Sequence, residues 1–183
     1  MVTGTPGPQP CGPSGGGGTA RYASGKAAET LPLRSHLMAA GGEGTLERLR
    51  LLGRGAWGSV YHVRDLKDGR DFALKVSGQA SAVQRESARC ETQLLKEFRH
   101  PAIVGYFADW EDEHEHFLLL ELCHGNLREL LGEPRDFDEE YILSLFAQLC
   151  CGVAYLHSCG VVHGDLKTSN VCVLTLSFDS LGK

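Results

Sequence analysis

The stretch Gly53-Arg54-Gly55-Ala56-Trp57-Gly58-Ser59-Val60 decides the fold of this chain. Its three glycines fall in a turn that we expect between two strands, at 46–52 and 59–64. Because glycine has no Cβ, such a turn lets backbone N–H groups approach phosphate oxygens closely. Taken alone, the pattern also fits an ordinary hairpin loop, so its meaning depends on the residues that follow.

The next informative feature is a lysine inside an apolar strand. We expect a strand at 70–76, and Lys75 stands within it in the run Phe72-Ala73-Leu74-Lys75-Val76. An unpaired buried charge is costly, so this lysine needs a partner. Glu91, on a helix expected at 82–98, is the natural one, because Glu86 faces another side of that helix and Glu97 lies near its end. A solvated lysine at a strand edge is the alternative.

The third feature is a polar loop, His163-Gly164-Asp165-Leu166-Lys167-Thr168-Ser169-Asn170, that follows the longest expected helix at about 137–158. A carboxylate at Asp165 can orient an attacking hydroxyl and accept its proton. Lys167 can neutralise a transferring phosphoryl group, and Asn170 offers Mg²⁺ a hard oxygen ligand. His163 is expected to brace the loop by hydrogen bonds.

These three motifs, in this order, resemble the ATP-binding half and the catalytic loop of eukaryotic protein kinases. Glu91 also lies nine residues before His100-Pro101, which is the spacing that kinases use for their helix-borne glutamate. The resemblance implies ATP and Mg²⁺, with Asp165 and Lys167 catalytic and Asn170 a metal ligand. It assigns nucleotide contacts to Gly53, Arg54, Gly55, Ala56, Trp57, Gly58, Ser59, Val60, Ala73, Lys75, Glu91, Leu120, Glu121 and Cys123.

Within that set, 119–123 is expected to be the hinge between two lobes. Leu120 would be the gatekeeper beside the adenine, and the backbone of Glu121 and Cys123 would bond its amino group and ring nitrogen. The implied fold class is α+β and protein-kinase-like. We expect a complete five-stranded N-lobe with one helix, followed by the first helices and catalytic loop of a truncated C-lobe.

The chain divides into three parts. Residues 1–44 are rich in Gly, Pro and Ser and are predicted to be a disordered tail. Residues 45–123 are the expected N-lobe and hinge, with further strands at 103–110 and 116–122. Residues 124–183 are the expected partial C-lobe. In it, Asn126 caps a short helix at 127–131, Asp136 or Asp138 caps the long one, and Gly160 ends it.

Composition limits the class of protein. A net charge of −5 gives no basic footprint for nucleic acid. Seven cysteines without a C-x-x-C pair favour free thiols in a reducing compartment over a disulfide framework. We find no signal peptide and expect no membrane segment in this chain. The Cys and His residues at 150–172 suggest a zinc site, but no zinc-ligand spacing is present, and buried thiols are the preferred interpretation.

Among kinases, the sequence is similar to the Wee/Myt family of inhibitory cell-cycle kinases. The similarity lies in Tyr106-Phe107-Ala108-Asp109-Trp110 with the acidic turn after it, in the hinge Glu121-Leu122-Cys123, and in Gly164, which replaces the usual arginine. It implies a protein substrate, specifically a cyclin-dependent kinase, phosphorylated on Thr or Tyr. The expected location is intracellular, in nucleus or cytoplasm, with endomembrane association in a longer form as an alternative.

One kinase motif is missing from these residues. Phe178-Asp179-Ser180 is not Asp-Phe-Gly, so the second Mg²⁺ ligand of a kinase is not among residues 171–183. Two functions therefore stay open. The parent protein is expected to transfer the γ-phosphoryl group of ATP to a protein Ser, Thr or Tyr hydroxyl. The alternative is a catalytically dead fragment that binds a nucleotide or a partner, with part of its long apolar helix uncovered.

Overall fold

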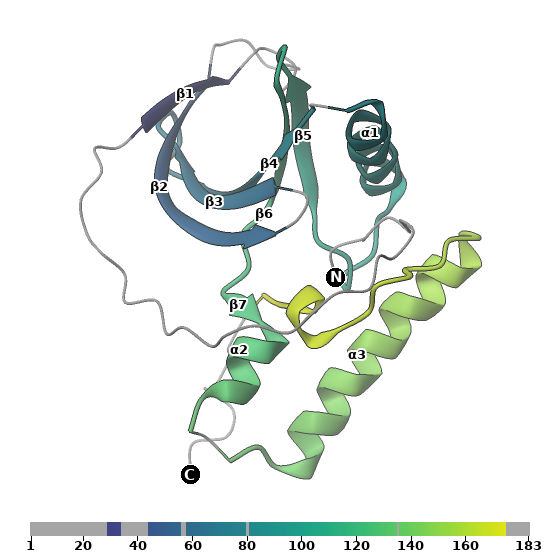
Figure 1. The fold of residues 1–183 in the computed structure, drawn as a ribbon. Coiled ribbons are helices and arrows are strands. Elements are labelled where there is room, and N and C mark those ends of the chain that lie inside the picture. Colours follow the sequence, from purple (N-terminus) through teal and green to yellow (C-terminus); the bar gives the residue numbers. More distant parts are fainter. Residues whose placement is uncertain (1–28, 34–43, 56–57, 80, 135, 175–183) are drawn as a thin grey trace, which may run out of the picture.

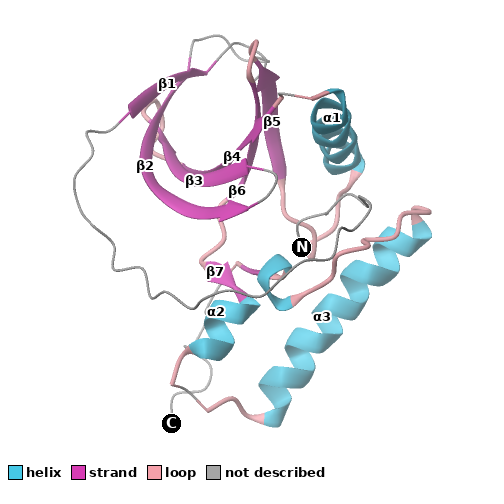
Figure 2. Ribbon diagram, viewed as in Figure 1, coloured by secondary structure: helices cyan, strands magenta, loops and turns pink. Residues whose placement is uncertain are grey.

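A computed structural model describes residues 29–33, 44–55, 58–79, 81–134 and 136–174. Its larger part is an antiparallel six-stranded sheet with the strand order β1-β2-β3-β4-β6-β5. The sheet curls into an open barrel with α1 outside it, and α2 and α3 lie below (Figures 1 and 2). The elements of the sheet region are β1 (Glu29–Leu33), β2 (Gly44–Gly55), β3 (Gly58–Asp65), β4 (Asp71–Gly78), α1 (Ala82–Glu97), β5 (Tyr106–Glu111) and β6 (Glu115–Glu121).

The five expected strands and the expected helix are all present, so the kinase-like fold is confirmed. Two details differ. Residues 29–33, which we assigned to a disordered tail, form β1 and pair with the edge of β2, and that assignment was wrong for them; the other tail residues lie outside the described residues. β5 begins at Tyr106 rather than at 103. Ile103 and Val104, which we expected in the strand, belong to the loop before it and are buried there.

The hairpins follow from their turn residues. Gly69 has φ 75°, a left-handed conformation that glycine adopts without strain, and its N–H donates to the Asp65 carbonyl at 2.8 Å. The Asp65 N–H in turn donates to the Arg70 carbonyl at 2.8 Å. This turn joins β3 to β4, as Asp68-Gly69 predicted. It sets the register that places Val60 opposite Lys75.

Two apolar clusters lie on opposite faces of the sheet. One contains Leu46, Val63, Phe72, Leu74, Val76, Ala108, Phe117 and Leu119. The other contains Ala73, Leu95, Phe98, Ile103, Val104, Leu118, Leu120 and Leu156, and it joins the sheet to α1 and to α3. Because side chains alternate along a strand, β4 and β6 contribute residues to both clusters. The second cluster connects the two lobes.

Helix α1 begins with a complete capping box. The Ser81 hydroxyl accepts from the Gln84 N–H at 3.2 Å, and the Gln84 side chain accepts from the Ser81 N–H at 3.1 Å. Phe98 ends the helix in extended conformation, with Pro101 just beyond it. The buried residues of α1 are Ala88, Glu91, Thr92 and Leu95. Two of these four are polar, which is unusual for the inner face of a helix.

The lower part contains β7 (Gly125–Asn126), α2 (Leu127–Gly132), α3 (Glu139–Ser158), a 3₁₀ turn at Thr168–Asn170 and β8 (Cys172–Val173). Asn126 caps α2 as expected. Asp138, one of the two candidates, caps α3 by accepting from the Tyr141 N–H at 2.7 Å. Gly160 has φ 74° and follows the end of α3, as expected.

The C-terminal end of α3 is attached to the loop after α1. The Tyr155 hydroxyl accepts from the Arg99 N–H at 3.0 Å, and the Tyr155 ring stacks on His100 with centroids 4.8 Å apart. Leu156 is fully buried in the cluster between the lobes. Farther toward its N-terminus α3 is open, since Ile142 and Phe146 are 51% and 61% exposed. The expected uncovered part of the apolar helix is therefore present.

By length and composition alone, α3 could cross a membrane. It has 20 residues and a mean hydropathy of 1.3, and only 11% of its apolar stretch is buried. Such a signal from one helix is weak, because core helices of soluble proteins give it too. The absence of a membrane segment stays a prediction. We interpret α3 as a C-lobe helix, because its last turns pack against the N-lobe and lead into the Asp165 loop.

Candidate active site

An ion pair between Lys75 and Glu91 lies at the centre of the N-lobe. The Lys75 Nζ is 2.7 Å from Glu91 Oε1 and 2.6 Å from Oε2. The two side chains are 17% and 8% exposed, so the pair is largely removed from water. Glu86 and Glu97 are both exposed and do not reach this lysine. The sequence therefore identified the correct partner, and the alternative of a solvated lysine was wrong.

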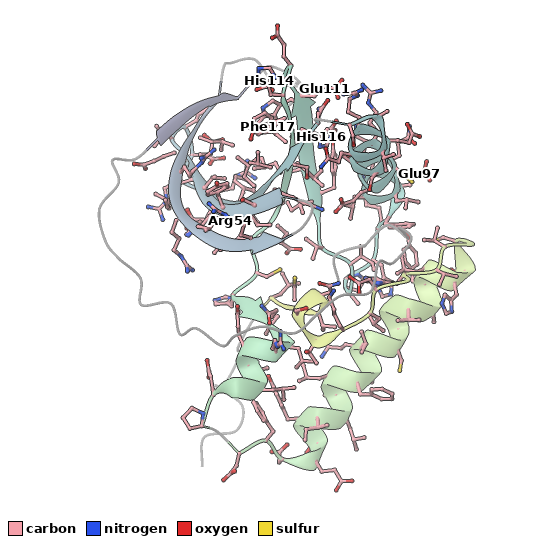
Figure 3. The ribbon with its side chains drawn as sticks, in the orientation of Figure 1. Arg54, Glu97, Glu111, His114, His116 and Phe117 are labelled. Carbon is pink, nitrogen blue, oxygen red and sulfur yellow. The ribbon has the colours of Figure 1, made fainter. Side chains whose placement is uncertain are left out.

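The glycine turn joins β2 to β3, with Gly55 opposite Gly58, and Val60 just after it lies opposite Lys75. Gly58 has φ 134°, and a Cβ there would lie 2.0 Å from the Val76 carbonyl oxygen. Only glycine fits at this position. Gly53 and Gly55 have open space around their missing Cβ atoms, so they leave room for a ligand. Arg54 is exposed (Figure 3), and Ala56 and Trp57 lie outside the described residues.

Four of the predicted nucleotide contacts converge on the cluster between the lobes. Ala73 and Leu120 are buried members of that cluster, and Val60 and Cys123 pack against it. They come from β4, β6, β3 and the hinge segment, so four separate parts of the chain meet here. The structure thus brings together four of the residues that the kinase resemblance assigned to the nucleotide.

The hinge is held by Gly105 in the loop before β5. The Glu121 N–H donates to the Gly105 carbonyl at 2.9 Å, and the Glu121 carboxylate accepts from the Gly105 N–H at 3.1 Å. Among the described residues, no backbone hydrogen bond from the Cys123 N–H is present, which leaves this N–H free to bond a ligand. Contact with Cys172 and burial raise the pKa of the Cys123 thiol, so the thiol stays protonated.

The catalytic-loop residues form one hydrogen-bonded group. The Lys167 Nζ donates to Asp165 Oδ2 at 2.8 Å, and Asn170 Nδ2 donates to Oδ2 at 2.9 Å and to the Asp165 carbonyl at 2.8 Å. His163 is buried, and its Nδ1 accepts from the Asp165 N–H at 3.3 Å, which is the bracing role expected for it. The spacing in sequence thus becomes proximity in space.

The electrostatics of Asp165 follow from these contacts. The hydrogen bond from Lys167, with that from Asn170, lowers the pKa of the Asp165 carboxyl below its usual range. The group is therefore ionised at neutral pH and can accept a hydrogen bond from a hydroxyl. Both Asn170 contacts use its amide nitrogen, so its amide oxygen is the atom that could bind a cation.

Sequence reasoning missed one polar pair near the site. Thr92 and His116 are both buried, and they contact each other between α1 and β6. The available signal was a threonine beside Glu91 and a histidine at the start of an otherwise apolar strand. The zinc interpretation finds no support, since the described residues contain no group of three or more Cys, His, Asp or Glu side chains that could hold a metal ion. The preferred interpretation of buried thiols was also wrong for Cys150, Cys151 and Cys159, which are exposed.

Comparison with known proteins identifies the family. The model of the protein kinase domain matches residues 46–177. The chain belongs to the protein kinase family. It is 31% identical to serine/threonine-protein kinase Nek4 of Mus musculus over 73% of this chain, and 35% identical to serine/threonine-protein kinase Nek11 of Homo sapiens over 66%. It is also 32% identical to serine/threonine-protein kinase PLK4 of Xenopus tropicalis over 67%.

These alignments cover 18%, 20% and 14% of the three relatives, so this kinase chain spans a fifth or less of their length. The residues present fit ATP, because the glycine turn leaves room for a ligand, Glu91 fixes the Lys75 ammonium, and the Cys123 N–H is free. They also supply part of a possible Mg²⁺ site, because the Asp165 carboxylate is ionised and the Asn170 amide oxygen is available.

Proposed function

We propose that this kinase chain binds ATP between its lobes and that the whole protein transfers the γ-phosphoryl group to a protein hydroxyl. The observation that carries the proposal is the buried Lys75–Glu91 pair at 2.6–2.7 Å. A lysine fixed in this way presents its ammonium group to phosphate oxygens without losing side-chain entropy when the nucleotide binds. The relatives' shared name, serine/threonine-protein kinase, supports the same reaction class.

In the proposed reaction each residue has a separate task. The hinge backbone at 121–123 orients the adenine, and Lys75 holds the phosphates. The Asp165 carboxylate accepts the hydrogen bond and then the proton of the substrate hydroxyl. Lys167, 2.8 Å from Asp165, stabilises negative charge on the phosphoryl oxygens. Mg²⁺, when bound, would neutralise further phosphate charge, with Asn170 among the residues that would hold it.

A matched pair of variants tests the nucleotide site. Lys75→Met should abolish binding of a fluorescent ATP analogue, whereas Lys67→Met, at an exposed position in the β3–β4 turn, should leave binding unchanged. Fluorescence titration of the 183-residue chain measures both. Equal affinity of the Lys75→Met variant and the wild type would contradict the proposal. In the whole protein, Asp165→Asn should remove phosphotransfer and retain ATP binding.

The finer proposal is that the whole protein is an inhibitory kinase of the Wee/Myt type that acts on cyclin-dependent kinases. Its support is the segment 106–110 with its acidic turn, the hinge residues, and Gly164 in place of arginine. The test is incubation of the whole protein with a cyclin-dependent kinase–cyclin complex, ATP and Mg²⁺. Phosphate on Thr or Tyr in the glycine loop of the substrate supports the proposal, and phosphate confined to other sites contradicts it. The location that goes with it is nuclear or cytoplasmic, or endomembrane-associated in a longer form.

A second candidate concerns the 183 residues themselves. The exposed apolar residues of α3, Ile142, Leu143 and Phe146, favour a chain that binds a nucleotide or a partner without turnover. The 183 residues also contain no Asp-Phe-Gly, and phosphoryl transfer depends strongly on positioning by both metal ligands of a kinase. Phosphotransfer by the purified chain that disappears in Lys75→Met would contradict this candidate.

A further inference from the structure

A buried polar pair lies beside the Lys75–Glu91 ion pair. Thr92, the neighbour of Glu91 on α1, is 3% exposed, and His116 on β6 is 4% exposed. The register of β4 and β6 sets Ser77 opposite His116 and Lys75 opposite Leu118. Side chains of directly paired residues point to the same face of a sheet, and so do those of residues two apart on one strand. Lys75, its partner Leu118 and His116 therefore lie on one face, with His116 two residues from Leu118. That is the side on which α1 packs (Figure 3).

The hydrogen bonds of Thr92 fix the proton on His116. The Thr92 hydroxyl donates to the Ala88 carbonyl at 2.9 Å, and this uses its one proton. Its oxygen must therefore accept from His116 Nε2, which lies 3.3 Å away. Nε2 carries the hydrogen, and the neutral imidazole satisfies this contact. Through it, β6 is joined to α1 one residue from Glu91.

The charges around this histidine are already balanced. Three carboxylates, Glu91, Asp109 and Glu111, and the Lys75 ammonium act on His116. Each carboxylate has its own cation, in the pairs Lys75–Glu91, Lys96–Asp109 and Arg89–Glu111, at 2.6, 2.6 and 3.0 Å. These groups come from α1, β4 and β5, the elements packed against His116. A proton on His116 would add a fourth cation to three carboxylates.

Burial keeps the imidazole neutral at pH 7. Desolvation lowers the pKa of His116 below its usual value of 6.5, although the three carboxylates act in the opposite direction. In acid, a charged imidazole beside Lys75 would repel the ammonium and compete with it for Glu91. The Lys75–Glu91 geometry then depends on the protonation state of a residue that the reaction itself does not use.

We propose that neutral His116 is a positioning residue for the Lys75–Glu91 pair, and that its protonation makes nucleotide binding by this chain sensitive to acid. The inference deepens the ATP binding proposed above and rests on it. If only the neutral form supports the pair, nucleotide affinity falls by up to about tenfold for each pH unit below the His116 pKa.

The test compares His116→Gln with His114→Gln. Glutamine can place an amide N–H near the position of His116 Nε2 and does not titrate. His114, in the exposed turn before β6, is the matched control. Binding of N-methylanthraniloyl-ATP is measured from about pH 7.5 downward until His116 has titrated, as followed by NMR of its imidazole, because burial lowers the His116 pKa below the ordinary histidine value. Protonation of the nucleotide affects all proteins equally, so the ratio between proteins isolates His116.

We expect wild type and His114→Gln to lose affinity together in acid, and His116→Gln to lose several-fold less. Parallel loss in all three proteins would overturn the proposal.

A second measurement needs no nucleotide and no variant. NMR of the wild-type chain follows the His116 imidazole and the Lys75 ammonium during an acid titration. The Lys75 signal should shift with the His116 titration, and a Lys75 signal that is constant while His116 titrates would also overturn the proposal. Coupled signals without nucleotide binding at any pH would support the positioning role and contradict the proposed function.

Discussion

The two lobes hold their functional residues in different ways. In the N-lobe, Lys75 and Glu91 are buried between β4 and α1, and two apolar clusters fix the elements that carry them. In the C-lobe, the Asp165 and Lys167 side chains are 50% and 55% exposed, and local hydrogen bonds hold the loop. The proposed nucleotide-binding residues are thus positioned by tertiary packing, and the proposed catalytic residues by short-range contacts. Matched substitutions in the two lobes should therefore have unequal effects on stability.

The largest difference is expected between the two lysine ion pairs. Glu91→Ala leaves Lys75 buried without its partner, which should lower the free energy of unfolding by about 3–5 kcal/mol. Lys167→Ala removes the partner of an exposed carboxylate, and we expect no measurable loss, because water replaces the contact. Urea denaturation of both variants measures the contrast. Equal losses would show that burial does not distinguish the lobes.

The next contrast concerns apolar side chains. Leu74 is fully buried in the sheet, so Leu74→Ala should cost about 2–5 kcal/mol through lost burial and a residual cavity. Leu143 on α3 is 57% exposed, and Leu143→Ala should change stability by less than about 0.5 kcal/mol. Both are measured by urea denaturation of the 183-residue chain. A large loss for Leu143→Ala would mean that α3 is covered in solution, for example by a second copy of the chain.

The same division explains what the sequence could predict. Local signals were sufficient for the glycine turn, the Asp68-Gly69 hairpin, the cap of α2 and the Gly160 helix end, because each depends on residues close in sequence. The Lys75–Glu91 pair, 16 residues apart, was predictable for another reason. A lysine in an apolar strand has to find a carboxylate, and the helix that follows offered one with suitable spacing.

The features that were missed depend on tertiary contacts. The sequence of β1 gives only a weak strand signal, because it contains Pro32. An edge strand such as β1 tolerates proline, because the N–H groups on the outer side of an edge strand need no partner in the sheet. Ile103 and Val104 resemble the start of a strand, yet they are buried because the loop packs in the cluster between the lobes. Nothing local pairs Thr92 with His116, 24 residues away. Burial of that kind is visible only once α1 is placed on the sheet.

A smaller effect is expected from the glycine turn. In Gly58→Ala the new Cβ would lie 2.0 Å from the Val76 carbonyl oxygen at a φ of 134°, so β3 must shift away from β4. We expect a loss of roughly 1–3 kcal/mol, typical of a residue forced into a disfavoured backbone region. Gly53→Ala, with nothing within 4 Å of the new Cβ, is the control. Thermal unfolding measures both, and equal melting temperatures would contradict the geometry.

The smallest expected effect is the loss of stability at low pH when the Asp109 carboxylate takes up a proton. Burial opposes the charged form of Asp109, but hydrogen bonds from Lys96 and Tyr106 outweigh it and lower the pKa below the usual 3.8. The unfolded state therefore takes up the Asp109 proton first as pH falls, so the stability from this contact is present above about pH 4 and is lost below it. With Lys96 45% exposed, the contribution should be about 0.5–1 kcal/mol.

Asp109→Asn should therefore be less stable than wild type at neutral pH and nearly equal to it in strong acid. Urea denaturation at several pH values below about 5 measures this convergence. Asp165→Asn provides the comparison with the other lobe. Its stability difference from wild type at neutral pH should be smaller than that of Asp109→Asn, because Asp165 contacts Lys167 at the surface rather than between two packed elements. A difference for Asp109→Asn that persists unchanged in strong acid would mean that the amide disturbs packing between α1 and β5, and that the lost stability is not electrostatic.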